Sequence, residues 1–234
     1  MDINNLAIGP KINDYISGLI LPQYVQLHFE GHHVQYQKKL VEYFNKHPNL
    51  LEDILNYAGN IMDNSYHPLS SYGTQKLLEK IIVYGLENNN SFLYNNAAQI
   101  WNHNLLWTSF TTNYMSNLEN FLQNNCPLTY QQIIKDFHHL NNFIEELITA
   151  HEKLFGNIWV WICWDVVNKK LEVKVSGNAS SLSHYHTIKP LLVIDLWEHA
   201  YYGQYQNKKL DYINNMINYL NWPLMESMLK ILSL

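Results

Sequence analysis

The fold is decided by the stretch Leu191-Leu-Val-Ile-Asp-Leu-Trp-Glu-His-Ala-Tyr-Tyr202. Its first four residues form a continuous apolar run, which is typical of a buried β-strand, and a helix is expected from about Tyr201. Asp195 ends the apolar run, and His199 follows four residues later. A carboxylate at the end of a buried strand is costly to bury unless it binds a cation or accepts hydrogen bonds. Asp195 therefore either caps the following helix, where aspartate is a favoured N-cap, or ligates a metal.

Two further strands are expected upstream of this stretch. Residues 158–164 are too short for a long helix and rich in strand formers, and residues 171–175 alternate between apolar and charged side chains. A helix is expected to open at Thr129 and to carry an apolar stripe as far as Leu147. Another helical segment is expected over 211–232.

The first half of the chain shows helical spacing and no strand pattern. Apolar residues recur at helical spacing over 21–44, and Pro48 disfavours helix at the residue before it, His47. A second helix is expected from about Thr74, with a break over the Asn-rich residues 88–91, and a third helix over 95–113. Residues 124–127, Asn-Asn-Cys-Pro, are typical of a linker. We therefore expect an α+β protein: an all-helical N-terminal hairpin subdomain (1–123), then a C-terminal subdomain (124–234) with a three-stranded antiparallel sheet and flanking helices.

The composition excludes several functional classes. The 234 residues carry 15 basic and 20 acidic side chains, a net charge of −5, and every basic residue is a lysine. A net-acidic chain without arginine is a poor candidate for nucleic-acid binding. Cys126 and Cys163 are too few for a disulfide framework or a cysteine-rich zinc site. No apolar run is long enough to span a membrane. The start of the chain lacks a targeting peptide, so we expect an intracellular protein of the cytoplasm, mitochondrion or another organelle.

Histidines at three places are candidate metal ligands. His28 and His32 lie four residues apart on one predicted helix, and His103 lies between two tryptophans. Asp195 and His199 belong to the stretch quoted first. Each histidine taken alone could be a hydrogen-bonded core residue. Together, three imidazoles and a carboxylate suit iron or manganese with a solvent ligand, and the same set would accept zinc.

The same segments carry a family resemblance. His28-Phe-Glu-Gly-His-His-Val-Gln-Tyr36, Asn95-Asn-Ala-Ala-Gln-Ile-Trp-Asn-His103 and Asp195-Leu-Trp-Glu-His-Ala-Tyr-Tyr202 closely resemble the iron/manganese superoxide dismutases. Phe155-Gly156 and Trp159-Val-Trp161 form a fourth matching block. The resemblance runs from about Leu21 to Leu220 and implies an enzyme that converts superoxide to dioxygen and hydrogen peroxide.

The resemblance also implies a role for each site residue. Gln99 would donate to a metal-bound solvent molecule. His32 and Tyr36 would line the substrate entrance. Across a two-fold interface, Glu198 would bond to His199 of a partner subunit and Tyr202 to the partner's His32, which implies at least a homodimer and allows a tetramer. The metal ligands would be His28, His103, Asp195 and His199, and the walls of the site Trp101, Trp159 and Trp197.

The position of the glutamine favours iron over manganese. In this family, iron enzymes typically carry it on the helix of the second ligand, as Gln99 is here, whereas manganese enzymes carry it in the C-terminal subdomain. The latter position matches Ala179 in this chain. The alternatives are a manganese-dependent or metal-promiscuous dismutase and a non-catalytic structural member of the same fold. A zinc hydrolase built on His28 and His32 is disfavoured because Phe29 stands where its glutamate would be.

The chain departs from the family pattern in three places, one of which is Ile158, where members usually carry a small residue before the first tryptophan of the block. His28 and His103 lie further apart than in most members, so an insertion around 45–90 is expected to lengthen the helical hairpin or to form a surface excursion. Lys209-Leu210 stands where members usually carry arginine and proline. Lysine keeps a positive charge that would attract superoxide but lacks the planar fork of arginine. Lys209 is therefore expected to steer the substrate.

Overall fold

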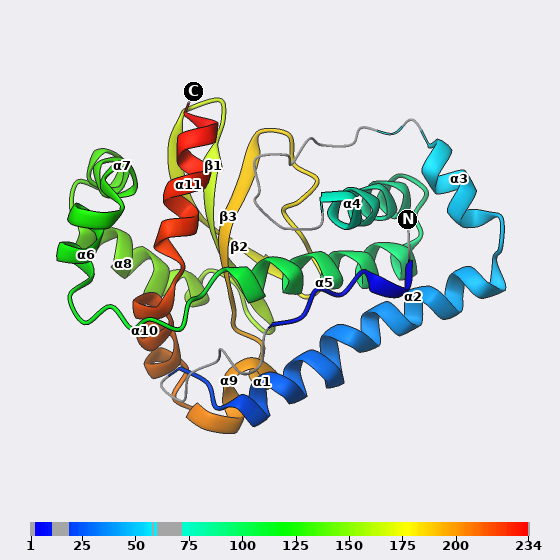
Figure 1. Ribbon diagram of the computed structural model, residues 1–234, viewed down its shortest axis with the longest axis horizontal. Helices are drawn as coiled ribbons and strands as arrows, with labels where there is room; N and C mark the ends of the chain where they lie inside the picture. Colours follow the sequence, from blue (N-terminus) through cyan, green and yellow to red (C-terminus); the bar gives the residue numbers. More distant parts are fainter. Residues whose placement is uncertain (1–2, 11–18, 58, 60–71, 234) are drawn as a thin grey trace.

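The computed structural model describes residues 3–10, 19–57, 59 and 72–233. Figure 1 shows a helical half, built on α2, α4 and α5, beside a half that contains the sheet and the C-terminal helices. The expected α+β architecture is confirmed. The helices are α1 (Pro22–His28), α2 (Val34–Lys46), α3 (Leu50–Asn56), α4 (Tyr72–Glu87), α5 (Ser91–Thr108), α6 (Leu118–Asn125), α7 (Pro127–Phe137), α8 (Leu140–Thr149), α9 (Glu198–Tyr205), α10 (Lys209–Tyr219) and α11 (Trp222–Leu232).

A π-helical turn interrupts the first long helix. The helix expected over 21–44 begins with proline at its first position, where the missing N–H costs nothing. It runs as α1, then as the π-helical turn Phe29–His33, and continues as α2. The segment ends at Lys46, as expected from the proline at position 48, because the residue before a proline disfavours helix.

The α4–α5 hairpin has the predicted break at its turn. Asn89 adopts a positive φ of 54°, and the Asn90 side chain accepts a hydrogen bond from the backbone N–H of Leu93, which caps α5. Gly85 allows the two helices to approach closely, since a Cβ at this position would lie 2.7 Å from the backbone nitrogen of Tyr94. Of the predicted insertion, the described residues include α3 and α4. Residues 60–71 lie outside the described part.

Two predicted helices are each broken into two. The helix expected from Thr129 to Leu147 splits into α7 and α8, because His138 adopts a positive φ of 69° that ends the first helix. The helical segment expected over 211–232 splits into α10 and α11 at Asn221, whose side chain accepts from the N–H of Leu224 and starts a new helix.

The predicted boundary between residues 123 and 124 falls inside α6, and only Cys126 separates α6 from α7. The division into two subdomains at this point stays a prediction.

The sheet is antiparallel, in the order β2-β1-β3. Every residue of the central strand β1 (Ile158–Asp165) is buried. Strand β2 (Lys170–Gly177) alternates in exposure for part of its length, as its sequence predicts, and β3 (Ile188–Asp195) is almost wholly buried. Asp195, the last residue of β3, pairs with Trp159 near the start of β1. The three expected strands are confirmed, each slightly longer than its sequence pattern indicates.

Helix α5 joins the two halves of the molecule. Each of its residues from Asn96 to Trp107 is buried, and the helix packs against α2, α4 and β3. A helix that is buried on all sides must place its polar side chains against specific partners. Asn104, for example, accepts from the N–H of Ile8 and donates to the carbonyl of Leu6. None of the helices among the described residues is both long and apolar enough to cross a membrane.

Candidate metal centre

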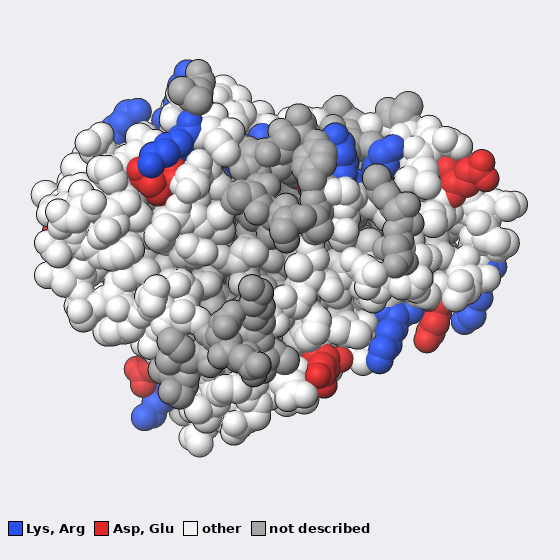
Figure 2. All heavy atoms as spheres, in the orientation of Figure 1, with Lys and Arg blue, Asp and Glu red and all other residues white. Residues whose placement is uncertain are grey.

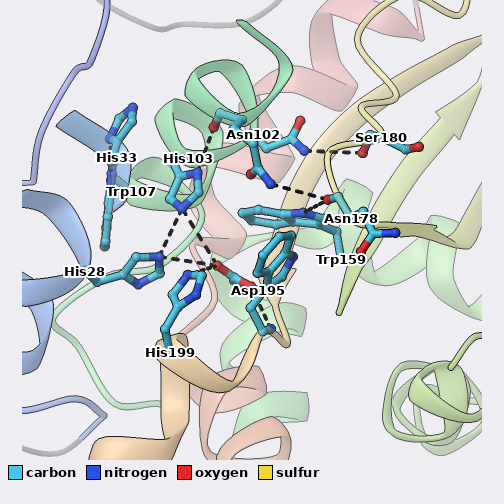
Figure 3. A network of polar contacts seen from close by, with 12 residues as sticks. His28, His33, Asn102, His103, Trp107, Trp159, Asn178, Ser180, Asp195 and His199 are labelled. Carbon is cyan, nitrogen blue, oxygen red and sulfur yellow. Dashed lines mark hydrogen bonds and ion pairs between the residues drawn. The ribbon is translucent and has the colours of Figure 1, made fainter. Parts of the chain in front are cut away.

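Four elements bring three imidazoles and one carboxylate to a single point (Figure 3). His28 ends α1, His103 lies in α5, Asp195 ends β3 and His199 lies in the first turn of α9. One potential ligand atom from each of the four lies within 4.8 Å of the other three. These are the four ligands that the family resemblance implies, and their assignment as ligands stays a prediction.

The atoms that converge are identified by their distances. Oδ2 of Asp195 lies 3.3 Å from Nε2 of His28, 3.7 Å from Nε2 of His199 and 4.0 Å from Nε2 of His103. The Nε2 atoms of His28 and His103 are 3.1 Å apart. Ligand atoms that each lie about 2.1 Å from one ion are separated by roughly 3 to 4 Å. The spacing therefore fits a single ion at the centre of the four groups.

The protonation states also suit a cation. Burial, together with the neighbouring imidazoles, lowers the pKa of His28 and of His103 to about 3. Burial lowers the pKa of His199 to about 3 as well, in spite of the nearby Asp195. The three imidazoles are therefore neutral at pH 7 and present lone pairs. His103 donates from Nδ1 to the backbone carbonyl of Gln99, at 2.7 Å, which leaves Nε2 without a proton and free to ligate.

Among the described residues, the carboxylate lacks a sufficient partner. Asp195 is fully buried, and burial raises the pKa of its carboxyl. Its Oδ1 accepts from the backbone N–H of Trp197 at 2.9 Å, whereas its Oδ2 has no hydrogen-bond partner. Nε2 of His199 is also buried without a partner. Buried polar atoms without a partner are costly. The convergence of Oδ2 of Asp195 and Nε2 of His199, both unpaired, is therefore the pattern expected of a metal site.

The alternative role of Asp195 as a helix cap is wrong. Helix α9 begins at Glu198, its N-cap residue is Trp197, and no side chain caps it. The hydrogen bond that Asp195 accepts from Trp197 orients the carboxylate instead of satisfying an amide inside the helix.

The predicted entrance residues lie beside the cluster. His32 stacks on His199 with ring centroids 3.8 Å apart and planes inclined by 12°. The ring of Tyr36 lies 5.7 Å from that of His103, and burial, followed by the charge of Asp195, raises the pKa of its phenol. Tyr202 is 51% exposed, so within one chain its side chain remains available to a partner.

The predicted tryptophan walls divide into near and remote members. Trp159 lies edge-on to His103 at 5.1 Å, and Trp197 lies 5.4 Å from His199. Trp101 lies further out: its ring contacts Trp161 at 6.4 Å, and its Nε1 donates to the buried carboxylate of Glu79.

Gln99 lies one helical turn before His103, and its amide is only weakly held. Its Nε2 reaches the backbone carbonyl of Asn178 at 3.5 Å, and its Oε1 is buried without a partner. The same carbonyl accepts a better hydrogen bond from Nε1 of Trp159, at 3.0 Å. Asn178 adopts a positive φ of 53° and precedes Ala179.

Sequence reasoning missed Trp107, His33 and the Asn178 carbonyl. Trp107 lies edge-on to His28 at 5.0 Å and donates from Nε1 to Nδ1 of the fully buried His33. One signal for Trp107 was available in the sequence. It lies four residues after His103 on one helix, a spacing that puts the two side chains on the same face. Nothing in the sequence indicated that a backbone carbonyl at Asn178 would meet Gln99.

The chain is similar to curated proteins along most of its length. A superoxide dismutase (Mn/Fe) of Rickettsia bellii is 30% identical over 207 residues, which make up 88% of this chain and 85% of that protein. The chain belongs to the iron/manganese superoxide dismutase family. The family model for the C-terminal domain of iron/manganese superoxide dismutases matches residues 125–228.

Two further relatives support the same assignment. A superoxide dismutase (Mn/Fe) of Rickettsia conorii is 35% identical over 153 residues, covering 65% of this chain and 68% of that protein. A superoxide dismutase (Fe) of Synechococcus elongatus is 39% identical over 132 residues, covering 56% and 60% respectively. The chain is therefore an oxidoreductase that acts on superoxide with iron or manganese.

Proposed function

We propose that this superoxide dismutase works with iron, held by His28, His103, Asp195 and His199. The observation that carries the proposal is the position of Gln99, on the same helix as His103 and one turn before it, with an amide that has no strong partner among the described residues. Ala179, at the alternative position, carries no group that could take its place. This is the arrangement that the family resemblance associates with iron.

Iron would supply a one-electron couple that oxidises one superoxide to dioxygen and reduces a second, which takes up two protons to become hydrogen peroxide. Zinc has no such couple. The residues of the chain set the charge at the metal and the acidity of its solvent ligand. Asp195 lowers the net charge of the site and so favours the higher oxidation state of the metal. Gln99 presents an amide N–H to a solvent ligand and thereby influences its acidity.

The entrance residues hold and deliver protons. Tyr36 is half-buried, and burial, followed by the charge of Asp195, raises the pKa of its phenol, so a hydroxyl that is protonated at pH 7 even at its ordinary pKa holds its proton more firmly. Its ring lies 5.7 Å from that of His103, so the phenol stands beside a predicted metal ligand. The stack of His32 on His199 places a second, half-exposed imidazole between the site and the solvent.

Reconstitution tests the choice of metal. The protein is purified, stripped of metal and loaded separately with iron, manganese and zinc, and the bound metal and the rate of superoxide consumption are measured on each sample. We expect activity with iron, little with manganese and none with zinc. A preparation that binds both ions but is more active with manganese would overturn the iron assignment.

We also propose that two copies associate through the start of α9. Glu198 and Tyr202 are exposed and lie four residues apart on that helix. His199 turns Nε2 toward the cluster, so its Nδ1 is available to donate to a carboxylate of a second copy. Light scattering on the metal-loaded protein should give the mass of a dimer or of a tetramer, and Glu198→Ala should shift the population toward the monomer. A monomer at micromolar concentration in the unmodified protein would refute the interface.

A further inference from the structure

The charge of this chain presents a difficulty for an enzyme with an anionic substrate. The net charge is −5 and no arginine is present, so attraction of superoxide depends on the placement of individual lysines. On the face shown in Figure 2, basic and acidic side chains of the described residues are interspersed near its edge. A local cation close to the site would therefore dominate the field that the substrate meets, since the Debye length at physiological salt is only about 8 Å.

Lys39 is such a cation. It is exposed on α2, and its ammonium lies over the ring of Tyr36, 5.6 Å from the centroid. The ring of His103 lies 5.7 Å from the same tyrosine ring. Tyr36 is thus close both to the ammonium and to a predicted metal ligand. The cation–π contact holds the flexible lysine near the entrance residue and leaves its N–H donors facing solvent.

No carboxylate among the described residues forms an ion pair with Lys39. Glu42, one turn further along α2, is exposed and unpaired with it. The charge of Lys39 is therefore not cancelled by a direct contact.

Lys209, the steering residue expected from the sequence, has a different setting. It is half-buried, and its ammonium lies 5.8 Å from the ring centroid of Tyr201, which stacks on Tyr212. Lys209 therefore contacts a tyrosine of α9, whereas Lys39 contacts Tyr36, the residue predicted to line the entrance.

We propose that Lys39 is an anion-guiding residue at the mouth of the site, which raises the local concentration of superoxide at Tyr36. The inference rests on the dismutase function and adds a specific residue to it. No bond is made or broken by Lys39. Its effect is on the encounter rate and on the affinity for small monoanions, and both depend on salt.

The size of the effect follows from Coulomb's law. For a charge reversal roughly 10 Å from the substrate in water, kcat/KM should fall about two- to threefold at 0.01 M salt and about 1.5-fold at 0.15 M. At 1 M salt, where the Debye length is about 3 Å, the variant and the unmodified enzyme should have equal rates.

The experiment compares Lys39→Glu with Lys46→Glu in the metal-loaded enzyme. Lys46 is exposed on the same helix two turns further from Tyr36, so the second variant has the same net charge and serves as the matched control. Stopped-flow measurement gives kcat/KM from 0.01 to 1 M salt, and spectroscopic titration gives the dissociation constant of azide. Lys39→Arg keeps the charge and should restore the salt dependence.

We expect a clearly larger salt-dependent loss of kcat/KM and weaker azide binding in Lys39→Glu than in Lys46→Glu, whose more distant charge should cost less than about 1.5-fold even at 0.01 M salt. A salt dependence equal to that of the unmodified enzyme, or the same loss in Lys46→Glu, would overturn the guiding role while the enzyme remained active. Absence of activity in the unmodified enzyme with either iron or manganese would instead refute the dismutase function, so the two failures are distinguishable.

Discussion

Replacing Asp195 by asparagine should have opposite effects on the metal-free and the metal-loaded protein. In the metal-free protein the carboxylate is fully buried, its Oδ2 has no partner, and the three imidazoles around it are neutral at pH 7. A buried charge without compensation costs several kcal/mol, in part relieved because burial raises the pKa of the group. The amide of Asn has nearly the same shape and carries no charge.

The structure sets the magnitude of the gain. The Asn side chain can keep the hydrogen bond from the Trp197 N–H through its oxygen and can donate from nitrogen to Nε2 of His28, which lies 3.3 Å from Oδ2 in the unmodified chain. One new hydrogen bond is worth about 1 kcal/mol, and removal of the buried charge adds to it. We expect metal-free Asp195→Asn to be about 1 to 3 kcal/mol more stable, a rise in Tm of roughly 2 to 12 °C for a chain of this size.

When metal is bound, the unmodified protein should be more stable than Asp195→Asn. An ion at 1,000 times its dissociation constant stabilises the folded protein by about 4.1 kcal/mol, which is more than the gain expected for the metal-free variant, and the variant lacks the only anionic ligand of the set. Denaturant unfolding should therefore be followed for both proteins, stripped with chelator and then loaded with iron. If stripped Asp195→Asn were less stable than the stripped unmodified protein, the carboxylate would be a satisfied structural group and the reasoning would fail.

Three further predictions concern stability away from the metal centre. Burial alone would raise the pKa of Glu226, but hydrogen bonds from Thr129 and its neighbours outweigh burial and lower it. Glu226→Gln should therefore cost about 2 kcal/mol at pH 7, and the difference should shrink as the pH falls below about 4, where the unfolded carboxyl is protonated; equal losses at pH 7 and pH 3 in urea titrations would contradict this. Gly85→Ala should lose about 2 kcal/mol or more, because its Cβ would meet the α5 backbone, whereas Gly73→Ala, on the same helix and with open space around it, should gain up to about 0.5 kcal/mol. His138→Gly should gain about 0.5 to 1 kcal/mol by thermal unfolding, since glycine adopts the positive φ of 69° without strain; a loss would show that the imidazole makes a stabilising contact.

Sequence reasoning was most successful where structure depends on near neighbours. The apolar run 191–194 is part of β3, the Asn-rich segment 88–90 separates α4 from α5, and the charged alternation of 171–175 lies within β2. These features follow from side-chain periodicity and from turn residues, which act over a few positions. The splitting of α7 from α8 was missed because the apolar stripe continues on both sides of His138, and only the backbone conformation of that residue reveals the break.

The site shows the same division between local and tertiary information. The residues of the predicted site were named from four separate blocks of sequence, and their identity needed no coordinates. Sequence could not show that Oδ2 of Asp195 lacks a hydrogen-bond partner, that Gln99 competes with Trp159 for one carbonyl, or that Lys39 lies over Tyr36. Each of these depends on atoms from segments far apart in the chain.

Residue types and their spacing therefore account for the kinds of element, the family and the set of chemical groups. The charge and the pairing of those groups depend on how the folded chain packs around them. Burial by α5 and the sheet makes the imidazoles neutral and leaves the Asp195 carboxylate in need of a cation. Desolvation is a property of the packed molecule, and no single segment of the chain contains it.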